Sequence, residues 1–309
     1  MNKIKNNLTF FIIFTFILLI FKYNFILNKS VIDGVNLWLN KVFPSLFIMF
    51  IINDLIINLN ILDNINKYLS PLFNKLFKTC GNSSIAFLLS IFSGTPSSAY
   101  IIKEMINSKN ISIEDANKLI SFTFFSNPLF LYNILSLSFN KFITIKIILI
   151  HYISNIFIGL IFRNKDTSSK IIYNHENKTK TNVFLLIPMS IKKSFDTLLM
   201  ILGTIVFYMI LSNLIIYIIP LSDILNVIVK GILEITQSLI FLPNININSL
   251  IKEIIAISII SFGGFSIHTQ MLSILSDTEI KYKNFFIGRV LQALISTITY
   301  LFLYFCIPS

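Results

Sequence analysis

Two stretches of this chain, FSGTPSSAYIIK (residues 92–103) and SFGGFSIHTQMLS (residues 261–273), place small and hydroxyl-bearing residues in the middle of strongly apolar sequence. Glycine and proline both interrupt helices, because glycine is conformationally free and proline has no backbone N–H. Each stretch is therefore predicted to break a hydrophobic segment. Because one stretch lies in each half of the chain, the sequence also predicts two related halves.

The composition places these breaks inside a membrane protein. Hydrophobic residues make up 55% of the 309 residues and charged ones only 13%, and the mean hydropathy is +0.79. Such values are typical of polytopic membrane proteins rather than of soluble domains. The formal net charge of +11 does not indicate nucleic-acid binding, because the basic residues fall mainly between the apolar segments. The two cysteines, Cys80 and Cys306, predict neither a disulfide framework nor a metal site.

Hydropathy predicts six full spans and two interrupted segments. The full spans are residues 8–27, 34–59, 116–139, 142–162, 183–219 and 285–305, and the interrupted segments are residues 85–105 and 250–275. No small-residue cleavage site follows the first span, which is therefore expected to be a retained anchor rather than a signal peptide. Hydropathy alone leaves open whether the interrupted segments cross the membrane fully or enter and leave on one side.

The distribution of charge decides between these alternatives for the first interrupted segment. Basic residues before the first span and in the loop of residues 163–182 predict that both regions are cytoplasmic. An even number of crossings must then separate them. Because four full spans precede the loop, residues 85–105 are predicted to form a re-entrant hairpin that turns at SGTPSS.

Each interrupted segment follows an amphipathic stretch. Apolar residues recur at helical spacing in residues 61–77 and again in residues 223–239, so each stretch is predicted to be an interfacial helix. The shared order predicts an all-α polytopic membrane protein of two inverted repeats, each with an amphipathic helix, a re-entrant hairpin and transmembrane helices. The predicted parts are an anchor (residues 1–30), a first repeat (31–162), a cytoplasmic basic loop (163–182) and a second repeat (183–309).

Two breaks at membrane depth predict a protein-lined cavity, because lipid cannot satisfy the backbone groups that leave helical geometry. Half-helices that begin there direct unpaired N–H groups and the positive ends of their dipoles inward, which suits an anionic or polar ligand. Close helix packing is the alternative role of such small residues. The candidate substrate-binding residues are Ser93, Gly94, Thr95, Pro96, Ser97, Ser98, Asn127, Gly263, Gly264, Ser266, His268, Gln270 and Arg289.

Four polar residues each leave a functional and a structural interpretation open. His268 contacts the ligand or forms a hydrogen bond to the other hairpin. Asn127 stands beside Pro128, where the helix unwinds near the hairpin or only kinks. Arg289 is a snorkelling anchor or a carboxylate clamp. Asp54 binds a coupling ion or proton, or simply lies at the interface.

The chain carries no catalytic sequence. It contains no G-x-S-x-G, H-E-x-x-H or Walker sequence and no Cys/His cluster, so we expect neither an enzyme nor a cofactor or metal. Since an ATP-binding sequence is also absent, a transporter of this kind would work by alternating access and use an ion or substrate gradient. A non-transporting membrane scaffold or sensor is the alternative from another functional class.

Four segments carry a family resemblance. They are FPSLFIMFIINDLI (43–56), FSGTPSSAYIIKEM (92–105), FSNPLF (125–130) and FGGFSIHTQMLSIL (262–275). In order and spacing they resemble the YlbJ family of sporulation integral membrane proteins, within the larger group that carries the nucleoside-recognition or Gate domain. The likeness covers residues 35–303.

This resemblance implies a fold similar to concentrative nucleoside transporters, in a multi-pass protein of the mother-cell membrane that acts at stage V of sporulation. It also implies a link to dipicolinic acid, a small planar aromatic dianion that moves from the mother cell towards the forespore across the outer forespore membrane. The expected partners are this anion and membrane lipid, and no nucleic acid is expected. Whether the chain also binds a second copy of itself or other sporulation membrane proteins is left undecided. A nucleoside or nucleobase transporter, or a scaffold or sensor for spore envelope maturation, is the alternative.

Overall fold

The computed structural model describes residues 10–11, 14–15, 17–59, 63–163 and 183–306, and all regular structure in these ranges is helical. Five helical stretches are long and apolar enough to cross a membrane. They are Asn24–Asn58, Lys141–Ile161, Val183–Ile218, Ser249–Leu275 and Tyr282–Cys306. The prediction of an all-α, multi-pass membrane protein is confirmed.

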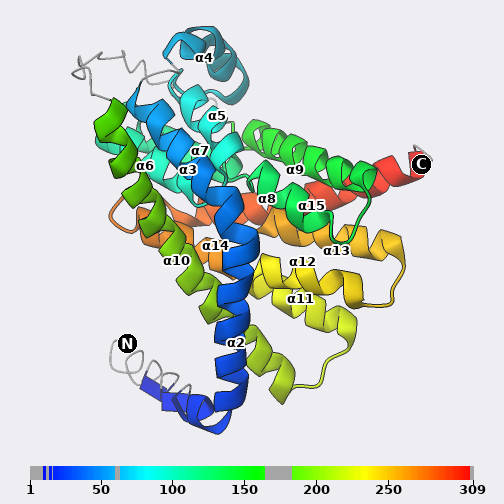
Figure 1. Cartoon of the computed structure of the whole chain (residues 1–309). Coiled ribbons are helices and arrows are strands. Elements are labelled where there is room, and N and C mark those ends of the chain that lie inside the picture. The colour runs from blue at the N-terminus through cyan, green and yellow to red at the C-terminus, as the bar shows by residue number, and fades with distance from the viewer. Residues whose placement is uncertain (1–9, 12–13, 16, 60–62, 164–182, 307–309) are drawn as a thin grey trace.

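The first long helix of the described chain consists of three consecutive elements. They are α2 (Asn24–Leu37), the π-helical turn η1 (Trp38–Val42) and α3 (Phe43–Asn58), which together form the long blue helix of Figure 1. The π turn ends two residues before Pro44, whose missing N–H removes one helical hydrogen bond. The predicted gap between the spans 8–27 and 34–59 is wrong, because one continuous helix runs through it. The predicted boundary of the anchor, at residue 30, falls inside α2. Residues 1–9, 12–13 and 16 of the predicted anchor lie outside the described chain.

The first interrupted segment folds back on itself as predicted. After the amphipathic helix α4 (Asp63–Phe77), helices α5 (Ser83–Ser93) and α6 (Ser97–Asn107) pack against each other. Gly94 forms the turn with a φ of +68°, in the region that glycine favours. A Cβ at this position would lie 2.5 Å from the backbone nitrogen of Asn127, so glycine also allows the turn to approach the next element.

The predicted span of residues 116–139 is not a continuous helix. Helix α7 (Ile113–Phe122) and helix α8 (Pro128–Leu135) are separated by five non-helical residues. Pro128 has no N–H to continue a helix, and the side-chain oxygen of Asn127 accepts a hydrogen bond from Phe130 N at 3.1 Å, which caps α8. The predicted unwinding at Asn127 and Pro128 is therefore confirmed. Helix α9 (Lys141–Ile161) comes next as the predicted full span.

The predicted interfacial helix of residues 223–239 is wrong, because the structure has a second helical hairpin there. Helix α10 (Val183–Ile218) precedes α11 (Asp223–Leu233) and α12 (Ile235–Phe241), and α11 and α12 pack against each other. Extended backbone at Glu234 separates them, and its carboxylate caps α12 by accepting from Gln237 N at 2.7 Å. The short 3₁₀ element η2 (Leu242–Asn244) then leads to the next helix.

The second interrupted segment does not form the predicted hairpin. Helices α13 (Ser249–Phe262) and α14 (Gly264–Leu275) succeed each other across the molecule instead of folding back (Figure 1). Gly263 and Gly264, with φ of +91° and +67°, interrupt the helix between them without reversing its direction. Helix α15 (Tyr282–Cys306) returns along α13 as the last predicted span.

The two halves repeat one order of elements, in a register that differs from the predicted one. Each half has a long helix (α3 or α10), a hairpin (α5–α6 or α11–α12), a broken helix (α7–α8 or α13–α14) and a final long helix (α9 or α15). The break at Ser126–Pro128 therefore corresponds to Gly263–Gly264, and the turn at Gly94 corresponds to Glu234. The predicted match of SGTPSS with SFGGF is wrong by one element.

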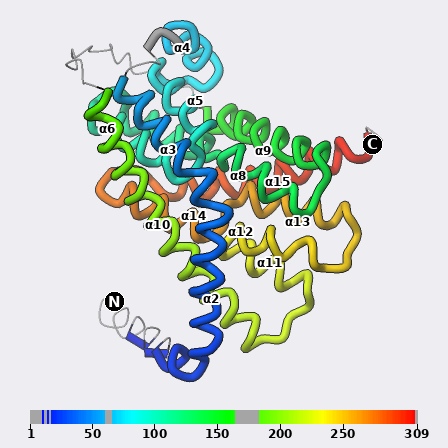
Figure 2. The backbone as a smooth tube through the Cα atoms, viewed as in Figure 1, coloured from blue at the N-terminus to red at the C-terminus, as the bar shows by residue number. Residues whose placement is uncertain are grey.

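The contacts between the halves obey the same repeat. Between the halves, α8 packs on the hairpin helix α12, and α14 packs on the hairpin helix α6. Within each half, α3 packs on α5 and α10 packs on α11. Helix α10 also lies beside α2 and α3 along one face of the molecule (Figure 2). Each broken helix is thus covered by the hairpin of the other half, and the four interruptions converge.

Candidate functional site

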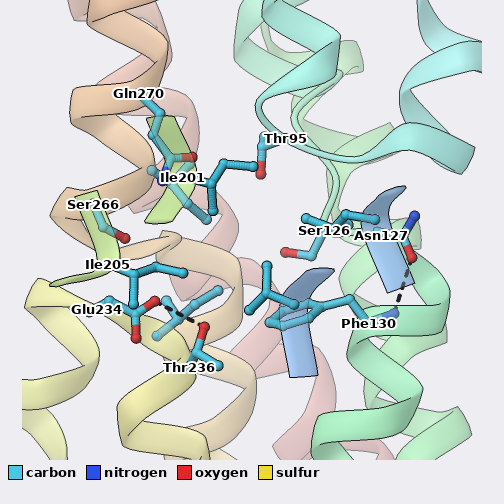
Figure 3. Close-up of a pocket in the computed structure, with 14 residues that line it drawn as sticks. Thr95, Ser126, Asn127, Phe130, Ile201, Ile205, Glu234, Thr236, Ser266 and Gln270 are labelled. Carbon is cyan, nitrogen blue, oxygen red and sulfur yellow. Dashed lines mark hydrogen bonds between the residues drawn. The ribbon is translucent and has the colours of Figure 1, made fainter. Parts of the chain in front are cut away.

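A cavity lies where the two hairpin turns and the two helix breaks meet (Figure 3). It measures about 440 Å³, counting the open solvent at its mouth. The polar lining residues come from the interruptions and are Thr95, Ser126, Asn127, Glu234, Thr236, Ser266 and Gln270. The apolar lining residues are Val42, Leu46, Phe130, Ile201, Ile205, Ile235 and Ile267. A chain this apolar thus gathers hydroxyl, amide and carboxylate groups around one central space.

Four helices begin beside this cavity. Lining residues lie at or next to the first turns of α6, α8, α12 and α14, namely Thr95, Asn127, Ile235 and Ser266. The first N–H groups of a helix lack partners within that helix and carry the positive end of its dipole. The cavity is therefore surrounded by the ends of helices that favour acceptor or anionic groups.

The first hairpin is tied to the first break by backbone and side-chain hydrogen bonds. Thr95 N donates to Phe125 O at 2.8 Å, and Asn127 Nδ2 donates to Phe92 O at 2.7 Å. Since Asn127 Oδ1 also caps α8, the amide of Asn127 is engaged in holding the non-helical segment. Asn127 therefore lines the cavity and also holds the backbone of the break in place.

Glu234 is a functional candidate absent from the residues predicted by sequence. Its side chain is 2% exposed, and one carboxylate oxygen accepts a hydrogen bond from Gln237 N at 2.7 Å. The other accepts from Thr236 Oγ1 at 2.9 Å (Figure 3). Among the described residues that line the cavity it is the one ionisable group. The signal in the sequence is an acidic residue inside the apolar run ILEITQ (residues 232–237), at a position from which it can cap the N–H three residues later. Helical periodicity conceals this signal, because it favours one continuous amphipathic helix through the same residues.

The structure divides the predicted substrate-binding residues. Thr95, Asn127, Ser266 and Gln270 line the cavity, where Gln270 Nε2 donates to Thr204 Oγ1 of α10 at 2.6 Å. The remaining candidates shape the turns or lie elsewhere. They are Ser93, Gly94, Pro96, Ser97, Ser98, Gly263, Gly264, His268 and Arg289.

His268 lies outside the cavity lining. Its ring forms hydrogen bonds with the hydroxyl of Tyr282, at 2.8 Å from Nδ1, and with the carbonyl oxygen of Phe262, at 3.2 Å from Nε2. Its centroid is also 4.8 Å from the ring of Phe285. These contacts join α14 to α13 and α15, so the structural interpretation of His268 is the one that the geometry supports, with partners other than the first hairpin.

Arg289 is neither at an interface nor in the cavity wall. Its guanidinium is buried, donating from Nη1 to Phe124 O at 2.6 Å and from Nη2 to Ser121 O at 3.1 Å and Asn155 Oδ1 at 2.8 Å. These acceptors include backbone carbonyls that the break after α7 leaves without helical partners. Arg289 therefore holds the broken helix from α15. Its burial contradicts the predicted snorkelling anchor, and the predicted carboxylate clamp would need a ligand to reach it outside the cavity lining.

A buried histidine and its neighbour support the same break, and neither is among the predicted site residues. His151 is 0% exposed, and its Nε2 accepts a hydrogen bond from Ser126 N at 3.3 Å. The hydroxyl of Tyr152 donates to Ser126 O at 2.7 Å. Side chains from α9 thus satisfy both backbone groups of a cavity-lining residue.

A second cavity lies along three elements, α3, α6 and α10. Its lining residues are Phe50, Asn53, Asp54, Ile57, Ser97, Tyr100, Ile101, Glu104, Lys193, Ser194 and Thr197. Asp54 Oδ1 lies 2.7 Å from Lys193 Nζ, and Glu104 Oε2 lies 3.4 Å from the same ammonium. Asp54 is therefore paired with a lysine of α10 rather than simply exposed at an interface.

Comparison with known proteins finds a related membrane protein. No family model and no solved structure matches the chain. The sporulation integral membrane protein YlbJ of Bacillus subtilis (strain 168) is 28% identical over an alignment that covers 86% of this chain and 74% of the relative. This match spans both repeats, and it identifies the chain as a relative of YlbJ and confirms the family resemblance predicted from its motifs.

Proposed function

We propose that the chain is a transporter of sporulating cells that carries a small polar metabolite through the central cavity by alternating access. The observation that carries the proposal is the convergence of two hairpin turns and two helix breaks on one cavity. Irregular backbone at membrane depth is tolerated where it lines such a cavity, and paired interruptions in two repeats are a feature of secondary transporters.

The reciprocal packing of the repeats supports an inverted arrangement. Helix α8 contacts the second hairpin through α12, and α14 contacts the first hairpin through α6. Two copies related in this way present the cavity to opposite sides of the membrane by equivalent movements. In this proposal α3 and α10 form the surface against which the hairpins and broken helices move.

Dipicolinate is the first candidate substrate. The cavity combines a largely apolar wall with a few convergent polar groups, which is the character of a small-molecule site. Phe130, Ile201 and Ile205 offer an apolar wall to a planar ring, and the positive dipole ends of the surrounding helices favour carboxylates. The relative's name, a sporulation integral membrane protein, supports a role in a membrane of sporulating cells. Within this proposal, the transport runs from the mother cell towards the forespore at the outer forespore membrane.

A nucleoside is the second candidate, favoured by a specific observation. The described lining residues include no Lys, Arg or His, and they include the carboxylate of Glu234 and the amide of Gln270. Carboxylate and amide groups pair well with ribose hydroxyls and with the edges of bases, and such a ligand needs no positive side chain. The two candidates therefore differ in whether binding requires negative charge on the ligand.

Thermal unfolding of the detergent-purified protein tests the proposal. Dipicolinate, uridine, adenosine and a neutral pyridine are compared, since a ligand at about 100 times its Kd adds roughly 2.7 kcal/mol to the free energy of unfolding. Stabilisation by dipicolinate but not by the pyridine is expected, and Gln270→Ala should reduce it. Ser273→Ala, an exposed position on the same helix, is the matched control.

The other outcomes assign the protein differently. Stabilisation by nucleosides without dipicolinate would favour the second candidate. If none of the compounds stabilises a folded protein, the transporter proposal fails and a non-transporting scaffold or sensor of the spore envelope becomes the better account.

A further inference from the structure

Glu234 combines deep burial with a place in the wall of the central cavity. Its side chain is 2% exposed, and it stands between α11 and α12, where the second hairpin turns. Two hydrogen bonds, from Gln237 N and Thr236 Oγ1, use part of the accepting capacity of its carboxylate. A carboxylate has about four acceptor positions, so capacity remains for a proton or a ligand.

No described basic side chain neutralises this carboxylate. The elements packed against α12 are α8, α11, α13 and η2, and their titratable groups are Tyr132, Asp223, Lys230, Lys252 and Glu253. The Lys230 ammonium lies 4.4 Å from the centre of the Phe241 ring, and Lys252 Nζ donates to Pro243 O at 3.1 Å. No ion pair joins Glu234 to any residue in the described part of the chain.

The elements on the far side of the cavity do not supply a cation either. On α10, Lys193 is paired with Asp54 of α3 and Glu104 of α6, at the second cavity, and Lys192 is exposed. On η1, Lys41 is not a lining residue and forms no ion pair with Glu234. On α14, His268 faces Tyr282 and Phe262 O. The charge of an ionised Glu234 is therefore uncompensated within the described protein.

An ionised carboxylate in this wall becomes unfavourable when a substrate displaces the water of the cavity, because losing that water without gaining a counter-charge costs several kcal/mol. A transition-metal or divalent ion is a poor solution, since the described residues contain no group of three or more His, Cys, Asp or Glu side chains that could hold one. A single proton neutralises the group without further ligands. The resulting carboxyl group then becomes a hydrogen-bond donor.

We infer that Glu234 is the proton-binding site of the central cavity and that it is protonated when substrate is bound. This inference rests on the proposed transport function. One proton from solvent adds to the carboxylate as the substrate enters, and the neutral carboxyl donates its O–H to an acceptor oxygen of the substrate. When the substrate leaves, the same proton leaves for solvent and the carboxylate returns. Substrate and proton are thus carried together.

The test measures proton uptake on binding. Titration calorimetry of the full-length protein in detergent, in phosphate and in Tris, separates buffer ionisation from binding, with dipicolinate and uridine as the probes. Wild type should take up one proton per ligand, and its affinity should fall about tenfold for each pH unit above the protonation midpoint. Glu234→Gln should bind with no proton uptake and no such pH dependence.

Glu253→Gln is the matched control, because Glu253 is also buried but lies outside the cavity lining and accepts hydrogen bonds from Tyr300 and Ser249. This variant should keep the proton uptake of wild type. If Glu234→Gln fails to fold, the wild-type stoichiometry and that of Glu234→Asp still decide the question.

Wild-type binding without proton uptake would overturn the inference and leave the transport proposal standing, and so would uptake that persists in Glu234→Gln. An affinity that depends on sodium concentration but not on pH would also overturn it. Failure of wild type to bind either probe would instead overturn the proposed function, and the inference with it.

Discussion

Lys193 of α10 forms an ion pair with Asp54 of α3, with 2.7 Å between Nζ and Oδ1. The other oxygen of Asp54 accepts hydrogen bonds from Ser190 Oγ at 2.7 Å and from Asn58 Nδ2 at 3.0 Å. The carboxylate is thus held by groups of two long helices. The same ammonium reaches Glu104 of α6 at 3.4 Å, so it also touches the first hairpin.

Replacing Asp54 by alanine should destabilise the protein by about 1–2 kcal/mol, because three charge-assisted contacts are lost while the half-exposed lysine regains solvent. Glu104→Gln is the matched comparison. The side chains of Glu104 and Lys193 are 46% and 45% exposed, so this change should cost less than about 1 kcal/mol. Thermal unfolding in detergent measures both; equal losses would contradict the distinction.

Arg289→Lys should destabilise the protein although it keeps the positive charge. A lysine ammonium cannot reproduce the planar arrangement that reaches Phe124 O, Ser121 O and Asn155 Oδ1 together. Buried carbonyls left without a donor cost about 1–3 kcal/mol each. Relative to wild type, the decrease in Tm should be the same with and without ligand; unchanged stability with weaker binding would instead support the carboxylate clamp.

Gly94→Ala should disrupt the first hairpin, whereas Gly203→Ala should be tolerated. At Gly94 the φ is +68° and an added Cβ would lie 2.5 Å from Asn127 N, so the turn must move away from the break. At Gly203, in the middle of α10, nothing lies within 4 Å of an added Cβ, and alanine is the better helix former. Circular dichroism and Tm compare the two; a tolerated Gly94→Ala would speak against the close approach.

The two cysteines should react differently with a maleimide in detergent. Burial raises the pKa of the Cys80 thiol to about 11, and its Sγ lies 3.5 Å from Ser83 Oγ. Because the thiolate is the reactive form, Cys80 stays protonated and unreactive at pH 7–8, while exposed Cys306 reacts. Mass spectrometry should find one label in the native protein and two after unfolding; two native labels would contradict the burial.

Hydropathy is sufficient to predict the long helices α9, α10 and α15, because each is bounded by polar residues and contains no break that alters its path. The break at Asn127 and Pro128 is also predictable, since proline removes a backbone donor and the asparagine side chain caps α8.

The register of the repeats is not predictable from single residues. Glycine pairs can reverse a chain or only interrupt a helix, and the tertiary contacts differ for the two helices on either side, since α13 packs along α15 while α14 packs on α10 and α6. Conversely, α11 and α12 reverse at Glu234 with neither glycine nor proline at the turn itself. The predicted site inherits this error, because helical periodicity places the second hairpin turn, and with it Glu234, inside an interfacial helix.

The hydrogen bonds that Arg289 donates to the break after α7 constrain the order in which the chain folds during synthesis. Arg289 comes 165 residues after Phe124 and 168 residues after Ser121, so the carbonyls of both residues emerge from the ribosome long before their partner. The first repeat therefore cannot complete its own broken helix while it is being made, and the two repeats mature as one folding unit.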